Sequence, residues 1–527
     1  MFKTITDTIE YPSWTGARFK RLDVLDRVLD GTLYDHLPND FYTEEGHNGE
    51  YIPIQQRRPS VNSGFASQIV GVLARKLFSG RHAPRITHDN EEYAELVRTV
   101  IAQGSVYEKM LTAAIYGSVG SVAMTFAVID GVLRVDVWRA KYCRPVFSRT
   151  GALSALRVCY TTGGAALLAE GFTTDAKGQP ITDSYTYWYA REYGTQAETT
   201  FTPISDDDWN PEEYSWDVLT PQIQVEHNFG FVPGVWITNA PGGVGYDGNS
   251  TFGSVVNNII EMDYTLSQLG RGIRYSAAPQ LAVIGDMDNG DDFQRGPSMV
   301  LKLRTSRGDG DEKIGASDAK LLEMVGNGTQ VGINYIEELR KVTLEAISAS
   351  IKKHEIKGAL SGRAMEVSDD AFYDLAHMLR NSYGDSGLVP LVSKIMIAFQ
   401  KLGMLPIAIS DEELTAFGLR WPRLYPSTPS DELQMVESLV MASQNGLIDI
   451  DTAESYLWAQ MDLEDYRVAT PPQTETNEGN TDAPVPGEPG IEDDKYNEGI
   501  NTDPRRPGPQ GHMLPKRRVG GKQITID

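Results

Sequence analysis

Two runs of acidic residues are the first places where this sequence could support chemistry. Asp206, Asp207 and Asp208 stand side by side, and residues 286–290, Asp-Met-Asp-Asn-Gly, have the Asp-x-Asp spacing with which calcium-binding loops begin. Clustered carboxylates supply the oxygen ligands that divalent cations prefer. Three adjacent residues rarely converge on one ion, however, and the second run has glycine at its third ligand position and no closing glutamate. We interpret both runs as solvated acidic turns and predict no metal site.

A serine between two glycines is the next candidate for chemistry. Residues 384–387, Gly-Asp-Ser-Gly, match the core of a trypsin-like nucleophile motif. That mechanism also needs an upstream histidine and aspartate on a double β-barrel, whereas these glycines interrupt a predicted helix, so we interpret them as a helix break. No glycine-rich loop ends in Gly-Lys-Ser/Thr, and the eight histidines show no metal-ligand spacing. The sequence predicts no catalytic residues and no cofactor, and we do not expect an enzyme.

The composition describes the scaffold that positions any such residues. The chain has 527 residues, of which 40% are hydrophobic and 23% charged, values typical of a folded globular protein with more than one packed unit. Its net charge of -24 argues against a protein that wraps DNA by neutralising phosphates. A channel wall of this charge would let a duplex slide without deep electrostatic traps. The acidity could equally serve only to keep a large assembly in solution.

The cellular compartment is predicted from two features of the sequence. The first residues lack the basic start and apolar run of a signal peptide, and no stretch reaches the roughly 18 apolar residues of a membrane span. We therefore expect a cytoplasmic protein without membrane contact. The two cysteines, Cys143 and Cys159, fall among predicted paired strands. A disulfide between them is conceivable, but reduced, structural cysteines are the preferred interpretation.

The first half of the chain predicts helices followed by strands. Residues 1–60 have little periodicity apart from a short helix at 18–29, and we expect them to form an arm or capping layer. Apolar spacing predicts helices at 63–79 and 91–116 that pack together. Runs rich in Val, Thr, Tyr and Phe then predict strands. They lie at 121–160, 183–193 and 221–229, and Pro and Gly residues at 233–250 predict a boundary.

The second half predicts two long helices that flank a strand-rich insert. One helix, at 251–275, has an apolar stripe made of Ile259, Met262, Leu266, Leu269 and Ile273. The other, at 330–354, has a stripe made of Ile336, Leu339, Thr343, Ile347 and Ile351. Further helices are expected at 369–402, interrupted by Gly384, Gly387 and Pro390, and as a pair within 430–462 that turns at Gly446. Beyond residue 470 the chain is too polar to bury a core.

Several segments together resemble the portal proteins of tailed double-stranded DNA bacteriophages. Residues 57–60, Arg-Arg-Pro-Ser, precede the helix at 63–79, as in the wing of such proteins. His227, Gly230 and Pro233 have the spacing of the family's approach to its first stem helix. The order helix, strand insert, helix, glycine loop and helix matches the family's stem, clip, stem, tunnel loop and wing. Residues 425–432 are similar to the lead into the crown, so the resemblance covers about residues 15–465.

The resemblance implies an α+β portal fold with wing, helical stem, β-containing clip and helical crown, assembled as a ring. It divides the chain into an N-terminal wing (1–250), first stem helix (251–278), clip (279–328), second stem helix (329–354), tunnel loop (355–368), wing helices (369–429), crown (430–466) and disordered tail (467–527).

The function that the resemblance implies is a passive channel at one capsid vertex. A ring of this chain, a homododecamer in the family, would serve DNA packaging, retention and ejection in the virion after assembly in the host cytoplasm. Its partners would be the terminase large subunit, which hydrolyses ATP, the head–tail adaptor, and the major capsid and scaffolding proteins. Double-stranded DNA would pass through the ring. The alternatives are a metal-dependent phage nuclease and another ring-forming tail or adaptor protein.

Two groups of residues are the candidate sites within that ring. The tunnel group lies at the end of the second stem helix and in the following loop, where repetition around the ring would form a cationic belt against DNA phosphates; its members are Lys352, Lys353, His354, Lys357 and Arg363. The alternative is a solvated helix end whose cations complement the helix dipole. The clip group would dock the terminase or adaptor; its members are Asp286, Asp288, Asp291, Lys302, Arg304 and Arg307.

Overall fold

The computed structural model describes residues 5, 7–12, 15–208, 219–277, 280–284, 318–322, 327–347, 370–406, 409–410, 412–424 and 429–453. All of them belong to the first of two compact units, residues 1–457. They form a mixture of helices and strands, so the expected α+β class is confirmed. The strand bounds are β1 Asn39–Asp40, β2 Arg57–Arg58, β3 Arg85–Thr87, β4 Ser121–Ile129, β5 Val132–Arg139, β6 Cys143–Phe147, β7 Leu153–Gly163, β8 Thr186–Tyr193, β9 Ala197–Phe201, β10 Ile204–Ser205, β11 Pro221–Glu226, β12 Gly234–Thr238, β13 Gln280–Ile284, β14 Asp318–Leu322 and β15 Gly418–Arg420.

The helices carry most of the main core. Their bounds are α2 Ala17–Asp30, α3 Phe65–Phe78, α4 Glu91–Gln103, α5 Val106–Gly117, α6 Gly164–Ala169, α7 Val256–Ala277, α8 Asn327–Ala346, α10 Asp370–Arg380, the π-helix η6 Asn381–Leu388, α11 Val389–Lys401 and α12 Pro429–Gln444. Short 3₁₀ turns lie at η1 Ile54–Gln56, η2 Gly80–His82, η3 Ala140–Tyr142, η4 Asp206–Asp208, η5 Gly253–Val255 and η7 Glu413–Thr415.

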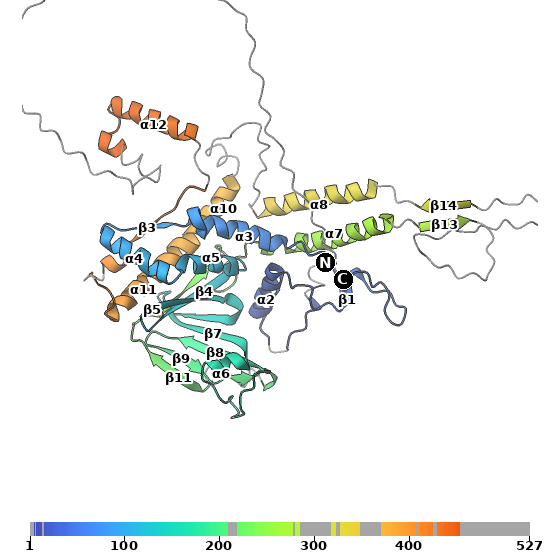
Figure 1. Cartoon of the computed structure of the whole chain (residues 1–527), viewed down its shortest axis with the longest axis horizontal. Coiled ribbons are helices and arrows are strands. Elements are labelled where there is room, and N and C mark those ends of the chain that lie inside the picture. Colours follow the sequence, from blue (N-terminus) through green and yellow to red (C-terminus); the bar gives the residue numbers. More distant parts are fainter. Residues whose placement is uncertain are drawn as a thin grey trace, which may run out of the picture. The chain divides into compact units, whose positions relative to one another are not determined.

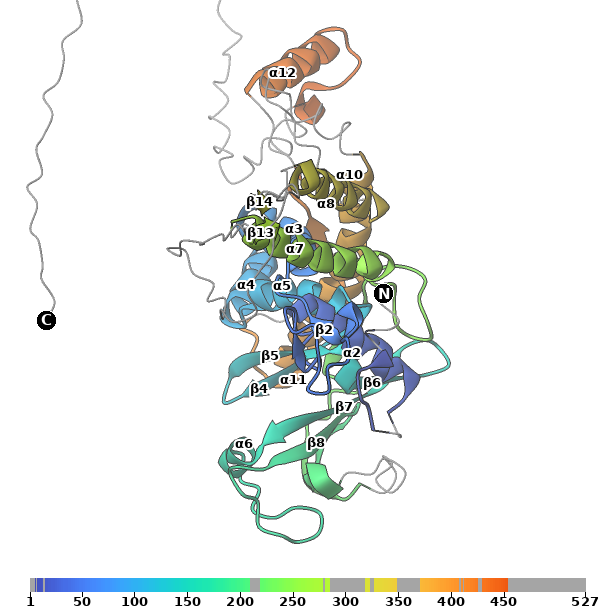
Figure 2. The ribbon, with the colours of Figure 1, turned by 90° about the vertical axis from the view of Figure 1, so that its right-hand side faces the viewer.

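Two antiparallel sheets lie below the helices. A three-stranded sheet has the order β12-β4-β5, and a second sheet has the order β11-β9-β8-β7-β6 with β10 paired to β8. In Figure 1 and Figure 2 the helices α3, α4 and α5 cover one side of β4 and β5, and the second sheet lies on the other side. Leu156, Val158 and Val232 fill a small core where the two sheets meet. The strands predicted within 121–160, 183–193 and 221–229 are confirmed.

One predicted helix is two helices in the structure. The segment 91–116 breaks between α4 and α5, where Ser105 has a left-handed backbone with φ of 49°. A Cβ atom on Gly104 would lie 2.6 Å from the Leu133 side chain on β5, so glycine permits this close approach. The break lets α5 turn back against α3, and the two helices pack as expected.

The segment 233–250, where a boundary was predicted, packs into the body of the protein. Strand β12 pairs with β4 over its whole length, and the backbone N–H groups of Asn239 and Gly248 both donate hydrogen bonds to the carbonyl of Gly120. Glycine and proline in this segment form tight turns within the core rather than a linker between domains. A Cβ atom on Gly243, whose φ is 109°, would overlap the backbone of Asp247 and Gly248.

The predicted helix break at residues 384–387 is wrong. The chain stays helical from α10 through η6 to α11, with a π-helical middle. The Cβ atoms missing from Gly384 and Gly387 would lie 2.7 Å from Trp421 and Ile237. Both glycines therefore allow close packing, and the extra residue of each π-turn keeps the helix continuous. Ser386 is exposed on the outer side of this helix.

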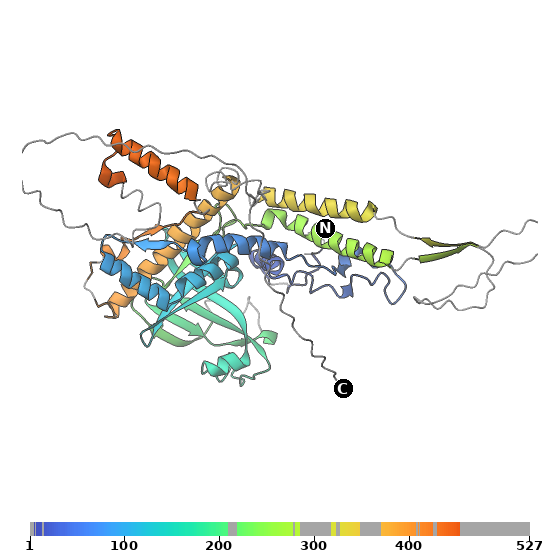
Figure 3. The ribbon, with the colours of Figure 1, turned by 45° about the horizontal axis from the view of Figure 1, so that its top comes forward.

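The predicted order of helix, strand insert and helix is present as a helical hairpin. Helices α7 and α8 are antiparallel and side by side, and β13 and β14 pair in the segment between them (Figure 1; Figure 3). At 1.5 Å per residue, α7 is about 33 Å long and α8 about 30 Å. Farther along, α12 ends before Gly446, which has the left-handed φ of 67° expected at the predicted turn.

Candidate functional site: a braced helical hairpin

The facing stripes of α7 and α8 are those that the apolar spacing predicted. On α7, Ile259 and Met262 are buried, whereas Ile273 near the far end is exposed. On α8, Thr343 and the following Ile347 are buried, and Ile336 and Leu339 pack against the main core; Ile351 lies outside the described residues. A Cβ atom on Gly332 would lie 3.0 Å from Leu269, so this glycine brings the two helices close together.

Helix α8 has a second apolar stripe that nothing in the described chain covers. Val331, Tyr335 and Val342 are 67%, 48% and 45% exposed. At about 100° per residue they lie within one narrow sector, roughly 100° around the axis from the buried stripe. Ile333, 38% exposed, lies on the opposite flank of the buried stripe. The exposed Glu338 lies at about the same angle, between Tyr335 and Val342. Exposed apolar side chains gathered on one sector of a helix are a feature of interaction surfaces. We call Val331, Tyr335 and Val342 the outer stripe.

The base of the hairpin is held by a buried carboxylate on α7. Asp263 accepts hydrogen bonds from the Tyr34 hydroxyl at 2.9 Å and from the Ser63 backbone N–H at 2.8 Å. Burial raises the pKa of Asp263, and these two hydrogen bonds oppose the rise. The next residue, Tyr264, donates its hydroxyl hydrogen bond to the backbone carbonyl of Arg57 at 2.9 Å. One turn of α7 is thereby tied to three points of the N-terminal segment.

Further contacts extend this brace along both helices. Arg271 on α7 forms an ion pair with Glu44, which also pairs with Arg57 at 3.3 Å, and Arg271 holds the pKa of Glu44 below its usual range. On α8, the guanidinium of Arg340 lies 5.7 Å from the ring centre of Phe65 at the start of α3. In the described part of residues 1–60, the segment expected to form an arm or capping layer, apolar side chains such as Leu22, Leu33 and Phe41 belong to the main core. This part therefore packs on the body of the protein and is not a detached arm.

The loop that enters α7 is clamped by two arginines of α2. Asp247 is buried and receives hydrogen bonds from Arg18 at 2.8 and 2.9 Å and from Arg21 at 2.9 Å. Arg18 also donates to the carbonyls of Cys143 and Ala140, at 2.9 and 3.0 Å, so one guanidinium joins α2, the loop and the sheet region.

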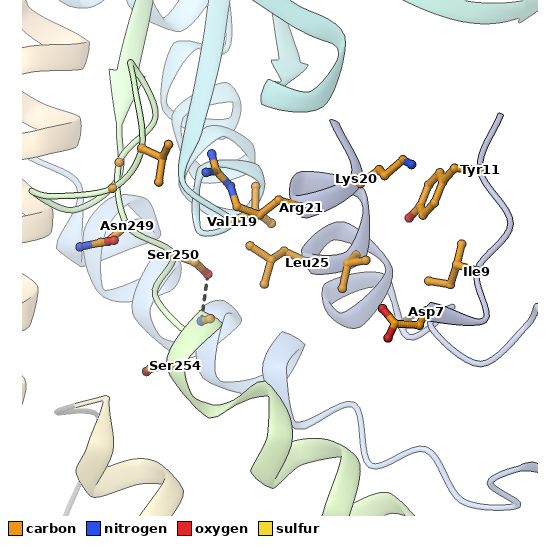
Figure 4. A pocket seen from close by; sticks show the side chains of 15 residues that line it. Asp7, Ile9, Tyr11, Lys20, Arg21, Leu25, Val119, Asn249, Ser250 and Ser254 are labelled. Carbon is orange, nitrogen blue, oxygen red and sulfur yellow. Dashed lines mark hydrogen bonds between the residues drawn. The ribbon is translucent and has the colours of Figure 1, made fainter. Parts of the chain in front are cut away.

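A cavity of about 1030 Å³ lies beside this clamp, between α2 and the residues that begin α7. Figure 4 shows Lys20, Arg21 and Leu25 of α2 on one side and Asn249 and Ser250 on the other. The Ser250 hydroxyl accepts a hydrogen bond from the Gly253 backbone N–H at 3.1 Å, the dashed line in Figure 4. This hydrogen bond satisfies one of the free donors at the start of η5.

Asn239 connects the π-helix to the same entry loop. Its side-chain oxygen accepts a hydrogen bond from the buried Tyr383 hydroxyl at 3.0 Å. Its amide nitrogen donates to the Asn249 carbonyl and to the Thr251 hydroxyl, both at 2.9 Å. The helix 370–401 and the base of α7 therefore share one buried hydrogen-bond network.

The segment with the His-x-x-Gly-x-x-Pro spacing is attached to α11 by two lysines. His227 stacks on Phe229, with ring centres 4.6 Å apart, and Gly230 has the left-handed φ of 76°. Lys401 donates to the Phe229 carbonyl and Lys394 to the Gly234 carbonyl, both at 2.7 Å. The motif therefore sets the turn that leads into β12.

Because Lys394 is largely buried, we expect the stability of the protein to depend on pH. Burial lowers its pKa from 10.5 to about 8. Between these values the unfolded chain binds the extra proton, so the free energy of unfolding should rise as pH increases from about 8 to 10.5, by on the order of 2 to 3 kcal/mol. Urea unfolding measures the free energy of unfolding of the native chain and of Lys394→Met at pH 7.5 and at pH 10. The gain between the two pH values in the native chain, minus the gain in Lys394→Met, gives the contribution of Lys394.

The neighbouring substitution Ser393→Ala removes no titratable group and is the control for this measurement. The native chain and Ser393→Ala should gain the same stability between the two pH values, and Lys394→Met should gain less. An equal gain in all three proteins would show that the Lys394 ammonium is not destabilised by burial.

The residues predicted as sites all lie outside the part of the chain that the structure describes. This holds for the tunnel group, Lys352, Lys353, His354, Lys357 and Arg363, and for the clip group, Asp286, Asp288, Asp291, Lys302, Arg304 and Arg307. The acidic run 206–208 is a 3₁₀ turn in which Asp206 accepts a hydrogen bond from the Trp188 ring N–H at 2.6 Å. Cys143 and Cys159 are both free thiols, as the preferred interpretation predicted, and burial raises the pKa of Cys159 to about 12.

The described residues contain neither a metal-binding cluster nor a membrane-spanning helix. Among the described residues, no group of three or more His, Cys, Asp or Glu side chains is placed to hold a metal ion. None of the described helices is both long and apolar enough to cross a membrane. No protein-family model matches the chain, and no curated protein matches it either.

Sequence reasoning missed the polar groups that hold the hairpin. Asp263 follows directly after Met262 and lies one helical turn beyond Ile259, which is a signal that a carboxylate stands next to a buried stripe. Asp247 and Asn239 had no such signal, because they lie in a turn-rich segment and their partners are far away in the sequence.

Proposed function

We propose that this chain is a portal protein, the subunit of a ring at one vertex of a phage capsid through which double-stranded DNA passes. The observation that carries the proposal is the outer stripe of α8. None of the residues that the structure describes covers this stripe, and exposed apolar side chains grouped in this way favour contact with another protein surface. The order of elements around the hairpin, which resembles that of portal proteins, suggests that this surface belongs to a second copy of the chain.

The two flanks of α8 favour a ring over a twofold dimer. The flank with the outer stripe has three apolar residues and the charged Glu338, whereas the opposite flank has one apolar residue, Ile333, beside the charged residues Glu337 and Arg340. Unlike flanks fit a head-to-tail contact, in which each copy presents one flank to each neighbour. Such contacts close into a ring when the rotation between copies permits it. The brace around Asp263 supports this arrangement because it gives every hairpin the same tilt on its body.

In the proposed assembly the ring guides DNA during packaging, retention and ejection and performs no chemistry itself. The tunnel group would face the DNA, and the clip group would dock the terminase large subunit and later the head–tail adaptor. Capsid and scaffolding proteins would surround the rim in the virion. A net charge of -24 fits a channel wall that repels the duplex over most of its length.

The test combines imaging of the native chain with substitutions in the outer stripe. Negative-stain images of the purified protein should show stemmed rings of about twelve copies with a central hole. The double variant Val331→Gln/Val342→Gln should remain folded, because both residues are exposed in the single chain, but should shift from rings to monomers in mass photometry at micromolar concentration.

The control variant is Ile223→Gln/Val225→Gln on strand β11, where the native side chains are 41% and 59% exposed. It removes a similar amount of exposed apolar surface away from the hairpin and should still form rings. A native chain that is monomeric at all concentrations contradicts the proposal. Intact rings in the outer-stripe variant would exclude this stripe as the contact between copies.

A further inference from the structure

A cavity at the C-terminal end of α3 gathers positive charge in an otherwise acidic protein. Its volume is about 430 Å³. The residues that line it come from the last turns of α3 and from η2, and the polar ones are Arg75, Lys76, Ser79, Arg81 and His82. We call Arg75, Lys76, Arg81, His82 and the neighbouring Arg380 the α3 cationic patch.

The charges that shift the pKa values of Lys76 and His82, two residues that line this cavity, come from cations. Burial lowers the pKa of Lys76, and the charges of Arg81 and Arg380 lower it further. Burial together with Lys76, Arg81 and Arg380 lowers the pKa of His82 to about 4, so this imidazole is neutral near pH 7. These groups repel one another, and the repulsion would be relieved by an anion placed among them.

Arg380 does not line the cavity, but it is a buried guanidinium whose charge lowers the pKa values of Lys76 and His82. Arg380 is 3% exposed. Its guanidinium lies 4.9 Å from the ring centre of Trp421 and donates a hydrogen bond to the Pro422 carbonyl at 2.9 Å. Within the described part of the chain no carboxylate pairs with it, and its Nε atom is buried without a hydrogen-bond partner. Burial lowers the pKa of Arg380 to about 10. A buried cation without a paired anion is costly, and an anion bound nearby would lower that cost.

Helix capping does not account for the whole patch. Arg75 and Lys76 lie in the last turn of α3, where cations complement the helix dipole. Arg81 belongs to η2, however, and Arg380 ends α10, so neither is placed by the dipole of α3.

We propose that the α3 cationic patch binds phosphate groups. Guanidinium groups donate paired hydrogen bonds to phosphate oxygens, and the cavity is large enough to admit one such group together with the atoms that carry it. The phosphate could belong to a DNA backbone or to free phosphate, and the chemistry of the site is the same for both. The inference holds whether or not the chain forms a ring, since the patch lies on α3, η2 and α10 and not on the outer stripe.

The test compares the native chain with Arg75→Gln/Arg81→Gln, in which both replaced side chains are exposed. Binding of a labelled 30-base-pair duplex is followed by fluorescence anisotropy between about 50 and 200 mM salt, and inorganic phosphate by ³¹P line broadening. The variant should bind the duplex roughly tenfold more weakly at low salt. Its plot of log affinity against log salt should be less steep by about 1.8, because two phosphate contacts are lost.

The matched control is Arg144→Gln/Arg149→Gln, which removes the same charge from exposed positions on β6 and the turn after it. If Arg75→Gln/Arg81→Gln loses both duplex and phosphate binding and the control keeps them, the proposal is supported and the bound phosphate group belongs to DNA. Loss of phosphate binding alone supports it with free phosphate as the source. Unchanged binding of both ligands, or an equal loss in the control, would overturn it, and ring formation in each variant reports separately on the proposed function.

Discussion

Replacing Asp247 by alanine is expected to lower the free energy of unfolding by about 3 to 4 kcal/mol, because it leaves two guanidinium groups without their shared carboxylate. Asp247 is almost fully buried, and the Arg18 side chain that holds it through two hydrogen bonds is 27% exposed. The Arg18 guanidinium also lies 4.7 Å from the Tyr246 ring centre. Chemical denaturation monitored by circular dichroism measures the loss.

Arg21→Gln is the matched control for Asp247→Ala. Arg21 donates one hydrogen bond to the same carboxylate, but its side chain is 37% exposed, so its removal should cost less than about 1 kcal/mol. If the two substitutions cost the same, the clamp between α2 and the entry loop does not depend on a buried charge.

Replacing Asp263 by alanine is the second change expected to have a large effect, a loss of about 3 kcal/mol. The Tyr34 hydroxyl and the Ser63 N–H would lose their acceptor inside the core, and each unsatisfied buried donor costs about 1 to 3 kcal/mol. Relief of a buried carboxylate offsets part of this cost, because burial raises the pKa of Asp263. Equilibrium unfolding in urea at pH 7 measures the net change.

Asp263→Asn separates the hydrogen bonds from the charge. Its amide oxygen can accept from the Ser63 N–H, and its NH₂ group can donate to the Tyr34 hydroxyl oxygen, so stability should stay within about 1 kcal/mol of the native chain. A loss in Asp263→Asn as large as that in Asp263→Ala would show that the carboxylate charge, not the hydrogen bonding, holds α7. Because the brace sets the tilt of the hairpin, we also expect Asp263→Ala to form fewer rings than Asp263→Asn if the proposed function is correct.

The buried networks suggest how distant segments keep a common geometry. Tyr383 of the π-helix reaches the entry of α7 through Asn239, and Arg18 of α2 reaches the same loop through Asp247. The base of the hairpin is therefore connected to α2 and to the π-helix η6 by short contacts. In a ring, a shift of one hairpin would be transmitted to its own body through these few residues.

Glycine was the residue whose role the sequence predicted least well. Gly446 stands at the predicted turn, where its left-handed backbone is a local requirement. Gly384 and Gly387 looked the same in the sequence, yet they lie inside a helix because Trp421 and Ile237 occupy the space of their missing Cβ atoms. A local pattern shows that a side chain is absent, but only the tertiary neighbours show whether the backbone or the packing requires the absence.

The sequence by itself determined the parts of this protein that depend on periodicity. Strands β4 to β8 and β11 follow from runs of β-forming residues, and the facing stripes of α7 and α8 follow from repeats of three to four residues, which a segment carries without its partners. Strands β9, β10 and β12 lie outside the predicted runs. The tertiary structure alone decided that apolar side chains from the described part of 1–60 belong to the core and that Asp263 and Asp247 hold the hairpin base. It also decided that no described residue covers the outer stripe. These features depend on pairs of residues some 200 positions apart, as in Arg18 and Asp247, and no local pattern encodes which distant side chain satisfies a buried charge.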